Sequence, residues 1–455
     1  MHGSGRLQIN PALRRSYDLR GVVGNTLNRM DAHALGRAFA GLARARGLRR
    51  IAVSRDGRLS SPELEPELVR GLIEGDCHVF RMPIGPTPLV SFTIHRLGLD
   101  GGIMITGSHN PPDQNGFKLH LGGHPLYGDA LGALWESDCA AASGGQVEDV
   151  DLSEDYLAAL LAEIDQLPPF SAAWDSGNGA TGGIVERLIA KLPGRHLPLH
   201  TRIDGRFPNH HPDPSVSANL ADLADAVLSE GLDLGIAFDG DGDRIGLVDS
   251  AGEIVWADQL LLLLARDVLS EQPGSAIVAD VKSSGTLFDG IAAAGGRPLM
   301  GPSGYVLVRE RMMREGAPLA GEMSGHIFFG DRWHHADDGL YVAMRAIRAL
   351  ARSSMSLRQF RESLPPTFAT PEIRLPCGDE RKAEVLGAIA ERIGDTASID
   401  RTDGLRVMEE DGWWLLRASG TEPKLTARCE AKDPASLERL KKILAELLRE
   451  QGLSF

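Results

Sequence analysis

The sequence repeats one pattern three times, in which an apolar strand runs into a polar turn containing glycine and a helical pattern follows. The three copies are residues 51–57, 172–179 and 276–285. Strands that alternate with helices predict α/β domains whose sheets are largely parallel and covered on both faces. The copies lie about 100 to 120 residues apart, which is an ordinary domain size. We therefore interpret them as three similar α/β domains.

The C-terminal part of the chain departs from this pattern. Residues 413–417 and 425–429 predict strands and 437–448 predict an amphipathic helix, which together indicate a small α+β domain. A chain of 455 residues is too long for one hydrophobic core. Small residues at 141–145 and the Leu-Pro-Pro-Thr run at 364–367 are candidate breaks. The predicted domains are 1–150, 151–253, 254–367 and 368–455.

The composition narrows the class of protein. Lys and Arg number 48 against 62 Asp and Glu, a net charge of -14, which argues against a nucleic-acid or anionic-membrane surface. The longest apolar run, 260–265, is too short to span a bilayer. The N-terminus lacks the build of a signal peptide. The four cysteines, at 77, 139, 377 and 429, show no disulfide-like spacing. These observations predict a soluble cytoplasmic protein in a reducing compartment.

A serine stands where the apolar stretch 102–105 ends in a turn. Ser108 lies within Thr-Gly-Ser-His-Asn-Pro at 106–111, at the strand end where α/β sheets carry their chemistry. The run is not a hydrolase elbow, because Thr106 and Asn110 occupy the positions where GxSxG needs glycine. Such a serine in isolation is more often a turn residue than a nucleophile. Lys118 follows closely and offers a cation.

An acidic loop gives the serine more weight. Asp239, Asp241 and Asp243 alternate with glycines, so three carboxylates can converge on Mg²⁺ or Ca²⁺. An EF-hand is excluded, because Arg244 and Ser250 stand where that loop needs Gly and Glu. The alternative is a solvated acidic turn, which the apolar stretch before it disfavours. A hydroxyl nucleophile with a hard-cation site indicates phosphoryl transfer, and Arg244 is a plausible phosphate contact.

Two further polar loops can bind a substrate. Glu322 and Ser324 lie between two glycines, and His326 follows the second. A carboxylate and a hydroxyl at this spacing can bind vicinal sugar hydroxyls or simply form a polar turn. Residues 417–423 follow a strand and combine Arg417, hydroxyls and successive backbone N–H groups, which suits either a phosphate cradle or an ordinary turn. The sequence GxxxxGK[ST] of a P-loop does not occur.

Taken together, these runs closely resemble the α-D-phosphohexomutase superfamily, specifically its bacterial phosphomannomutase/phosphoglucomutase branch. The matching runs follow in order along most of the chain, at 17–21, 106–118, 239–244, 280–286, 321–326 and 417–423. The resemblance implies an α/β fold with a four-domain, heart-shaped architecture. Three similar α/β domains would carry the phosphoserine, metal and sugar loops, and the C-terminal α+β domain would carry a phosphate loop.

The resemblance also implies roles for single residues. Ser108 would carry the phosphoryl group and, with the three aspartates, ligate Mg²⁺. The other catalytic groups would be Arg20, His109, Lys118, Arg244 and His326, with His326 as the acid/base candidate. The substrate-binding groups would be Tyr17, Lys282, Tyr305, Glu322, Ser324, Arg417, Ser419, Gly420 and Thr421.

The implied reaction moves a phosphoryl group between the 1- and 6-positions of glucose and mannose phosphates. Phospho-Ser108 would give a hexose 1,6-bisphosphate that turns end for end, with glucose 1,6-bisphosphate as intermediate and activator. Partners would be glucose 1-phosphate, mannose 1-phosphate and their 6-phosphate isomers, bound by a monomer. Two phosphate sites and exclusion of water are therefore needed.

One departure from the family pattern concerns the substrate. Tyr305 stands where close relatives carry a histidine that contacts the sugar, which leaves the choice between glucose and mannose open. Met323 resembles the hexose branch, whereas the run at 417–423 is shared with phosphoglucosamine mutases, so that activity remains an alternative. A Mg²⁺-dependent serine phosphatase and a non-catalytic sugar-phosphate sensor are further alternatives.

Overall fold

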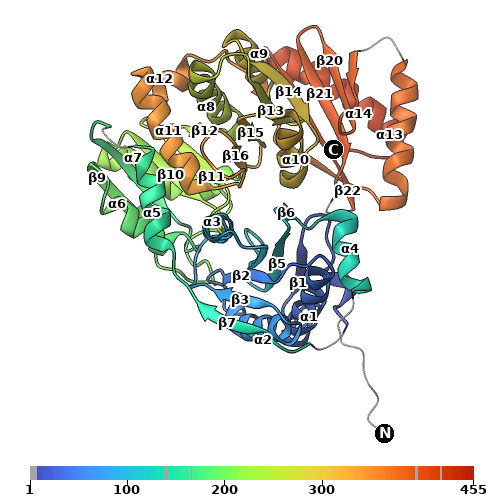
Figure 1. The fold of residues 1–455 in the computed structure, drawn as a ribbon. Coiled ribbons are helices and arrows are strands. Elements are labelled where there is room, and N and C mark those ends of the chain that lie inside the picture. The colour runs from blue at the N-terminus through green and yellow to red at the C-terminus, as the bar shows by residue number, and fades with distance from the viewer. Residues whose placement is uncertain (1–7, 138–141, 165–166, 395–397, 421–422) are drawn as a thin grey trace. The chain divides into compact units, whose positions relative to one another are not determined.

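The computed structural model describes residues 8–137, 142–164, 167–394, 398–420 and 423–455. The chain divides into two compact units, each of which is described by itself. The first comprises Met1–Trp256 with Ser324–Arg358, and the second comprises Ala257–Met323 with Gln359–Phe455. Within both units, helices lie against β-sheets (Figure 1).

The first sheet has the strand order β1-β5-β4-β2-β3-β7, with β6 beside β5. Strands β4, β2, β3 and β7 run parallel, whereas β1 and β5 add an antiparallel edge. Its core joins apolar residues of β2, β4 and β5 to those of α1 and α2. The elements are η1 (Pro11–Leu13), β1 (Leu19–Val22), α1 (Arg29–Ala45), β2 (Arg50–Arg55), α2 (Ser61–Glu74), β3 (His78–Arg81), α3 (Thr87–Leu97), β4 (Gly101–Ile105), β5 (Gln114–Leu121), β6 (His124–Pro125), α4 (Gly128–Glu136) and β7 (Gln146–Asp149).

The second sheet, also in the first unit, has the order β12-β11-β10-β8-β9. Its centre, β10-β8-β9, is parallel, and the hairpin of β11 and β12 extends it antiparallel. Helix α11 packs against α5 and β11. The elements are α5 (Ser153–Ala162), β8 (Phe170–Asp175), α6 (Gly182–Ile189), β9 (Gly194–Leu199), η2 (Ser217–Leu220), α7 (Ala221–Glu230), β10 (Leu234–Phe238), β11 (Ile245–Asp249) and β12 (Ile254–Val255). The later segment of the same unit adds β16 (Ile327–Phe329), which is not a strand of this sheet, and α11 (Gly339–Ser353).

The second unit contains a parallel arrangement around β13, which pairs with β14 on one side and β15 on the other. All five residues of β13 are buried, as expected for a central strand covered by helices. The elements are α8 (Ala257–Glu271), β13 (Ala276–Asp280), α9 (Gly285–Ala293), β14 (Arg297–Gly301), α10 (Tyr305–Glu315) and β15 (Leu319–Gly321).

The C-terminal sheet is antiparallel throughout its described pairings, in the order β17-β22-β21-β20-β19, with β18 also beside β22. Helices α13 and α14 cover one face, and Trp414, Leu440 and Leu444 lie in the core between them. The elements are α12 (Leu357–Glu362), β17 (Phe368–Ala369), β18 (Ile373–Pro376), α13 (Asp379–Ile393), β19 (Ser398–Asp400), β20 (Leu405–Glu409), β21 (Gly412–Ala418), β22 (Lys424–Ala431) and α14 (Pro434–Glu450).

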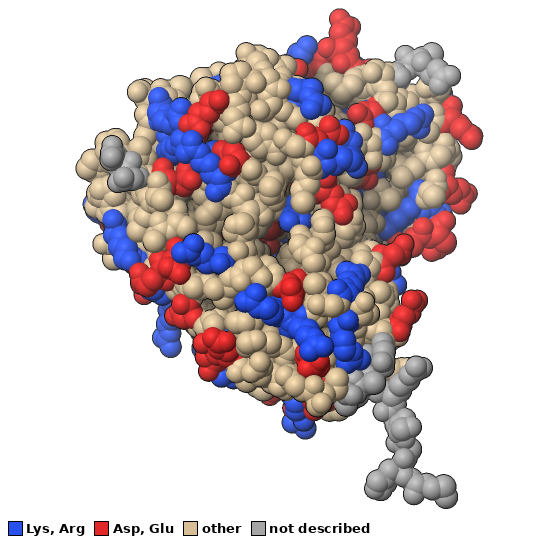
Figure 2. Space-filling view, in the orientation of Figure 1, with Lys and Arg blue, Asp and Glu red and all other residues tan. Residues whose placement is uncertain are grey.

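These sheets confirm the predicted fold class: three α/β sheets are followed by a different α+β sheet. The prediction of largely parallel sheets holds for their centres, but antiparallel strands border the first two. Within the part of the chain that the structure describes, none of the helices is long and apolar enough to traverse a lipid bilayer. On the face shown in Figure 2, basic side chains lie interspersed with acidic ones.

Candidate active site

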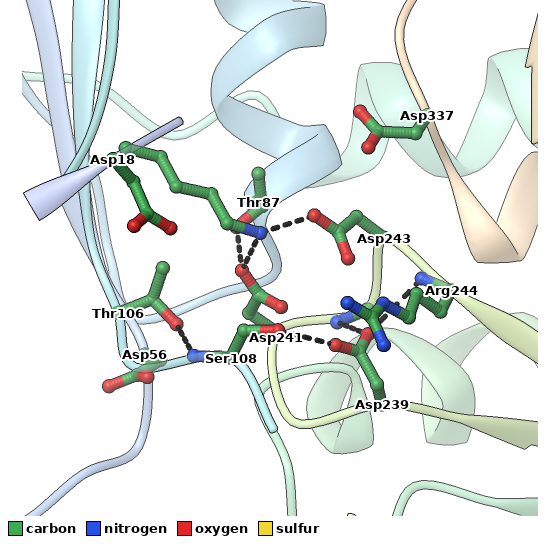
Figure 3. A network of polar contacts seen from close by, with 12 residues as sticks. Asp18, Asp56, Thr87, Thr106, Ser108, Asp239, Asp241, Asp243, Arg244 and Asp337 are labelled. Atoms are coloured by element: carbon green, nitrogen blue, oxygen red, sulfur yellow. Dashed lines mark hydrogen bonds and ion pairs between the residues drawn. The ribbon is translucent and has the colours of Figure 1, made fainter. Parts of the chain in front are cut away.

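Ser108 lies in a tight turn three residues after β4. Its backbone has a φ of 49°, a left-handed conformation that is uncommon outside glycine, and its side chain is buried. The backbone N–H of Ser108 donates to Oγ1 of Thr106 at 2.8 Å, which closes the turn. Oγ of Ser108 then donates to Oδ2 of Asp239 at 2.7 Å and lies 3.1 Å from Nδ1 of His109. The hydroxyl is therefore held at the edge of the aspartate cluster (Figure 3).

Arg58 holds the backbone of this turn in place through hydrogen bonds. Its fully buried guanidinium donates to the carbonyl oxygens of Ser108 and Asn110, each at 2.6 Å, and to those of Pro111 at 2.6 Å and Gln114 at 2.8 Å. Asp56 lies 3.2 Å from Nε of Arg58 and balances the charge. The geometry shows that this arginine is structural, because its donors are directed at backbone rather than outward.

The aspartate loop connects β10 to β11 and approaches the serine turn closely. A Cβ atom at Gly240 would lie only 2.4 Å from the carbonyl oxygen of Ser108, so a side chain there would push the two loops apart. The backbone N–H groups of Gly242 and Arg244 donate to Oδ1 of Asp239 at 3.0 and 3.1 Å. Glycine at 240 therefore places Asp239 against Ser108.

Lys118 and Thr87 meet the other two carboxylates. Nζ of Lys118, on β5, donates to Oδ2 of Asp241 at 2.7 Å and also to Oδ2 of Asp243. Thr87, at the start of α3, donates to the same oxygen of Asp241 at 2.5 Å. Although burial opposes ionisation, the charge of Lys118 holds the pKa of Asp241 well below its ordinary value. Burial and the charge of Asp241 instead raise the pKa values of Asp239 and Asp243.

The three carboxylates fit a divalent cation. One oxygen from each of Asp239, Asp241 and Asp243 lies within 4.8 Å of the others, and all three residues are buried. Among the described residues, Oδ1 of Asp241 and Oδ1 of Asp243 have no hydrogen-bond partner. A buried carboxylate oxygen without a partner is unfavourable, and a cation would satisfy both. An all-oxygen donor set is the one that Mg²⁺ and Ca²⁺ prefer.

Two more predicted residues, Arg20 and His109, border this cluster. Arg20 is anchored by Asp18 at 2.8 Å and donates to Oδ1 of Asn110 at 2.5 Å and to the carbonyl of Gly107 at 3.0 Å. Burial and the nearby charges of Arg244 and Arg20 hold the pKa of His109 well below its ordinary value. The imidazole of His109 is therefore neutral at pH 7.

His326 lies between an arginine and an aspartate. Nε of Arg244 donates to Nε2 of His326 at 2.9 Å, and Nδ1 of His326 lies 2.7 Å from Oδ2 of Asp337. An imidazole that accepts at Nε2 and donates from Nδ1 is neutral, and this arrangement selects one tautomer. Tyr17 is half-buried, two residues before β1.

The predicted sugar loop lies in the second unit as far as Met323. Oε1 of Glu322 accepts from Oγ of Ser303 and the backbone N–H of Gly304, each at 3.0 Å. Nζ of Lys282 lies 3.8 Å from both Glu322 and Asp280. Burial raises the pKa of Asp280, with Lys282 opposing and Glu322 adding to the shift. Tyr305 is half-buried at the start of α10. Ser324 begins a segment of the first unit, and its Oγ is buried.

The predicted phosphate loop follows β21. Nε of Arg417 donates to Oδ2 of Asp403 at 2.9 Å, and the same oxygen accepts from the backbone N–H of Ser303 at 2.9 Å. The carbonyl of Ser419 accepts from Nζ of Lys382 at 2.8 Å. Gly420 is exposed, and Thr421 lies outside the described residues. Asp403 therefore fixes one edge of the Arg417 guanidinium.

Sequence reasoning missed several residues of these sites. Arg58 directly follows the first copy of the repeated strand-turn pattern, at 51–57, and an arginine next to that turn could have been recognised as a candidate. Asp337 precedes Asp338, which caps α11 through a hydrogen bond from Tyr341, so it sits in a recognisable helix start. The local sequence pattern does not reveal Thr87 or Asp403, because Thr87 bonds to Asp241, 154 positions away, and Asp403 accepts from the N–H of Ser303, 100 positions away.

Comparison with known families agrees with this architecture. Four phosphoglucomutase/phosphomannomutase domain models match in order: α/β/α domain I at residues 12–134, domain II at 154–252, domain III at 256–368 and the C-terminal domain at 372–447. Three α/β domains followed by a different C-terminal domain are thus the organisation of the chain. The fold and the serine-aspartate site define the phosphohexomutase class.

Individual relatives are similar over nearly their whole length. The chain is 41% identical over 439 residues to a phosphomannomutase/phosphoglucomutase of Pseudomonas aeruginosa, covering 96% of this chain and 95% of that protein. It is 42% identical over 435 residues to a phosphoglucomutase of Neisseria gonorrhoeae, covering 94% of each. A phosphoglucomutase/phosphomannomutase family protein from Burkholderia thailandensis superposes with a TM-score of 0.91 at 38% identity, covering 98% of this chain and 99% of that one. The chain belongs to the phosphoglucomutase/phosphomannomutase family and is a mutase.

Proposed function

We propose that this enzyme reversibly transfers a phosphoryl group between the 1- and 6-positions of glucose and mannose phosphates, with Ser108 as the carrier. One observation carries the proposal. Oγ of Ser108 donates directly to Asp239, within a cluster of three buried carboxylates that fits a cation and is bordered by Lys118. A serine held in this way is suited to exchanging a phosphoryl group rather than to capping a turn.

In the proposed reaction, a sugar hydroxyl oxygen attacks the phosphorus of phospho-Ser108. The bond between that oxygen and phosphorus forms as the bond from phosphorus to Oγ breaks, which leaves a hexose 1,6-bisphosphate. The sugar hydroxyl loses its proton to Nε2 of His326, and Oγ leaves as an alkoxide whose charge Lys118 and the nearby arginines would offset; in the second half Oγ attacks the other phosphate and His326 returns its proton to the sugar oxygen. After the bisphosphate turns, the same steps run in reverse at its other phosphate.

The surrounding residues supply charge and position. Arg20, Lys118 and Arg244 would offset the charge of the transferring group, and neutral His109 would help to orient it. Mg²⁺ held by Asp239, Asp241, Asp243 and an oxygen on Ser108 would supply further charge compensation. Asp337 would keep His326 in the tautomer whose Nε2 accepts a proton, once Arg244 turns from the imidazole to the phosphate.

Residues of the second unit, together with Tyr17 and Ser324 of the first, would recognise the sugar and the passive phosphate. Glu322 and Ser324 are proposed to bind sugar hydroxyls, with Tyr305 contributing to the choice of epimer. The phosphate group that does not react would be bound by Lys282, Arg417, Ser419, Gly420 and Thr421, with Tyr17 as a further substrate contact. We propose that the four domains that carry these residues span 1–150, 151–253, 254–367 and 368–455.

We further propose that the enzyme works as a monomer in the cytoplasm. The thiols of Cys77, Cys377 and Cys429 are unpaired and buried, which suits a reducing compartment. Light scattering on the purified protein tests the monomer directly, and a mass of two chains would overturn it.

A coupled assay tests the function. Glucose 1-phosphate, mannose 1-phosphate and glucosamine 1-phosphate are each supplied with Mg²⁺, with and without a trace of glucose 1,6-bisphosphate. We expect the first two to be isomerised to their 6-phosphates, with the bisphosphate shortening any lag. Release of inorganic phosphate without isomerisation would overturn the mutase proposal, and faster turnover of glucosamine 1-phosphate would reassign the substrate.

A further inference from the structure

A second group of metal-ligating side chains lies in the second sheet, apart from the aspartate loop. One ligand atom from each of Asp175, His200 and His210 lies within 4.8 Å of the others. Asp175 is the last residue of β8 and is fully buried, whereas the imidazoles of His200 and His210 are mostly buried, at 19% and 13% exposure. The proposed mutase chemistry uses none of these three residues.

The hydrogen bonds around His210 leave a lone pair facing a carboxylate. Nδ1 of His210 lies 3.0 Å from the carbonyl oxygen of His211, a contact that needs the proton on Nδ1. Nε2 lies 2.9 Å from Oδ2 of Asp175, whose other oxygen accepts from the backbone N–H of Gly177. In a neutral imidazole, Nε2 and the carboxylate would repel each other, so a proton or a cation has to lie between them. A backbone carbonyl on the outer nitrogen is the usual support of a metal-bound histidine.

His200 has the same kind of outer support. Its Nε2 lies 3.1 Å from Oδ2 of Asp222, so that carboxylate places the proton on Nε2 and leaves the lone pair of Nδ1 for a cation. The backbone of His200 is left-handed, with a φ of 50°, and its carbonyl accepts from the N–H of Asn178 at 2.8 Å. Such a conformation is unfavourable for a residue with a side chain, and it persists where neighbouring bonds enforce it.

We propose that Asp175, His200 and His210 form a second metal site that takes a divalent transition metal, Zn²⁺ foremost. Two imidazole nitrogens and one carboxylate oxygen are ligands that Zn²⁺ accepts, with water in the remaining position. Mg²⁺ prefers an all-oxygen site, so the aspartate cluster and this site select different ions.

The site is placed to brace the aspartate loop. Strand β8, which ends in Asp175, pairs in parallel with β10, after which the aspartate loop begins. The segment that carries His210 continues to Pro212, whose carbonyl accepts from the N–H of Gly240 at 3.2 Å. The N–H of Ala180, from the turn after Asp175, donates to the carbonyl of Gly240 at 2.9 Å. A metal on these ligands would stabilise both supports of Gly240, so its role is structural.

The test titrates Zn²⁺ into metal-free enzyme by calorimetry in excess Mg²⁺, which occupies the oxygen site, and repeats it with Co²⁺ followed by absorption. We expect one Zn²⁺ per chain, a rise in Tm, and a Co²⁺ spectrum showing nitrogen ligation. His200→Gln and His210→Gln should each weaken Zn²⁺ binding by about a hundredfold or more, and Asp222→Asn by about tenfold. His124→Gln, at an exposed histidine of the first sheet, is the matched control and should bind as the wild type does.

Two outcomes of the Zn²⁺ titration would overturn the proposal. One is wild-type enzyme that takes up no Zn²⁺ under these conditions. The other is Zn²⁺ binding that is unchanged in both His200→Gln and His210→Gln while circular dichroism shows folded protein. The Co²⁺ spectrum of the wild type tests the site even if a variant fails to fold, because a spectrum typical of oxygen ligands alone would exclude histidine ligation.

Discussion

Oγ of Ser108 donates a 2.7 Å hydrogen bond to Oδ2 of Asp239, a residue 131 positions further along the chain. The bond joins the turn after β4 to the loop after β10, and so joins two different sheets. It places a hydroxyl against a carboxylate whose pKa is raised by burial and by the neighbouring charges of Asp241 and Asp243. The serine and the aspartate cluster therefore lie together as one site.

The first prediction concerns the phosphoryl carrier. Ser108→Ala should lose the covalent phosphoryl group and lower kcat by at least about 10⁴, because the transfer then has no acceptor on the enzyme. Intact-protein mass spectrometry measures the adduct. Ser137→Ala, which removes a half-buried hydroxyl bonded to the carbonyl of Leu134, is the control and should keep it. An adduct of unchanged occupancy in Ser108→Ala would show that another residue carries the group.

Lys118 should matter for both stability and turnover. Lys118→Met removes the cation that neutralises Asp241 and Asp243, so kcat/KM should fall by about 10²–10³. The uncompensated carboxylates should also make the protein depend more on Mg²⁺, so the rise in Tm on adding Mg²⁺ should exceed that of the wild type. Thermal unfolding with and without Mg²⁺ measures this. Lys191→Met, at an exposed ion pair with Glu154, should respond as the wild type does.

Arg58 should affect the serine turn only through its hydrogen bonds to backbone carbonyl oxygens. Arg58→Lys cannot reach the four carbonyl oxygens together, so it should destabilise the protein by about 3 kcal/mol and lower kcat. Arg55→Lys, which alters a more exposed pair with Glu65, should change stability by less than about 0.5 kcal/mol. Denaturant titration of both variants makes the comparison, and equal stabilities would contradict the role of Arg58.

Asp403 should position Arg417. Arg417→Ala should raise KM for hexose phosphates by about tenfold or more, because the variant lacks the cation that we propose binds the passive phosphate. Asp403→Asn keeps that cation but weakens its anchor, so it should raise KM less, with kcat nearly unchanged. Steady-state kinetics separates the two effects. If Asp403→Asn lowers kcat and leaves KM unchanged, Asp403 does not act through binding of the passive phosphate.

Asp338 should make stability depend on pH. Burial, reinforced by Asp337, raises its pKa to about 7, well above the value of about 3.9 in an unfolded chain. The folded state then binds the proton more tightly, so this group's contribution is fully present below about pH 4 and is lost as pH rises through 7. Asp338→Asn keeps an oxygen to cap α11, where Asp338 accepts from the N–H of Tyr341.

Asp338→Asn should remove this dependence of stability on pH. Relative to the wild type, Asp338→Asn should be more stable at pH 8 than at pH 5, by roughly 2 kcal/mol. The Tm values of both proteins, measured at several pH values between 5 and 8, test the slope. A difference in Tm that is constant across this range would contradict the assignment.

Much of the fold was determined by the sequence alone. Apolar runs ending in glycine turns predicted strands β2, β8 and β13, because a strand buried on both faces has to be apolar throughout. The α+β character of the C-terminal domain followed from strands and an amphipathic helix, which β21, β22 and α14 confirm. The antiparallel edge strand β1 was missed, since the direction of a pairing leaves no mark on a single strand.

The candidate site, like the fold, was predicted from the sequence only in part. Local spacing placed three carboxylates in one loop and a serine at a strand end, and the resemblance to phosphohexomutases supplied the roles proposed for them. Only the tertiary structure decided that Lys118 lies between Asp241 and Asp243, that Arg58 holds the serine turn and that Asp337 faces His326. Those contacts join residues that are distant in sequence or belong to different loops. Their partners are selected by how the sheets pack, and packing is a property of the folded chain rather than of any short segment.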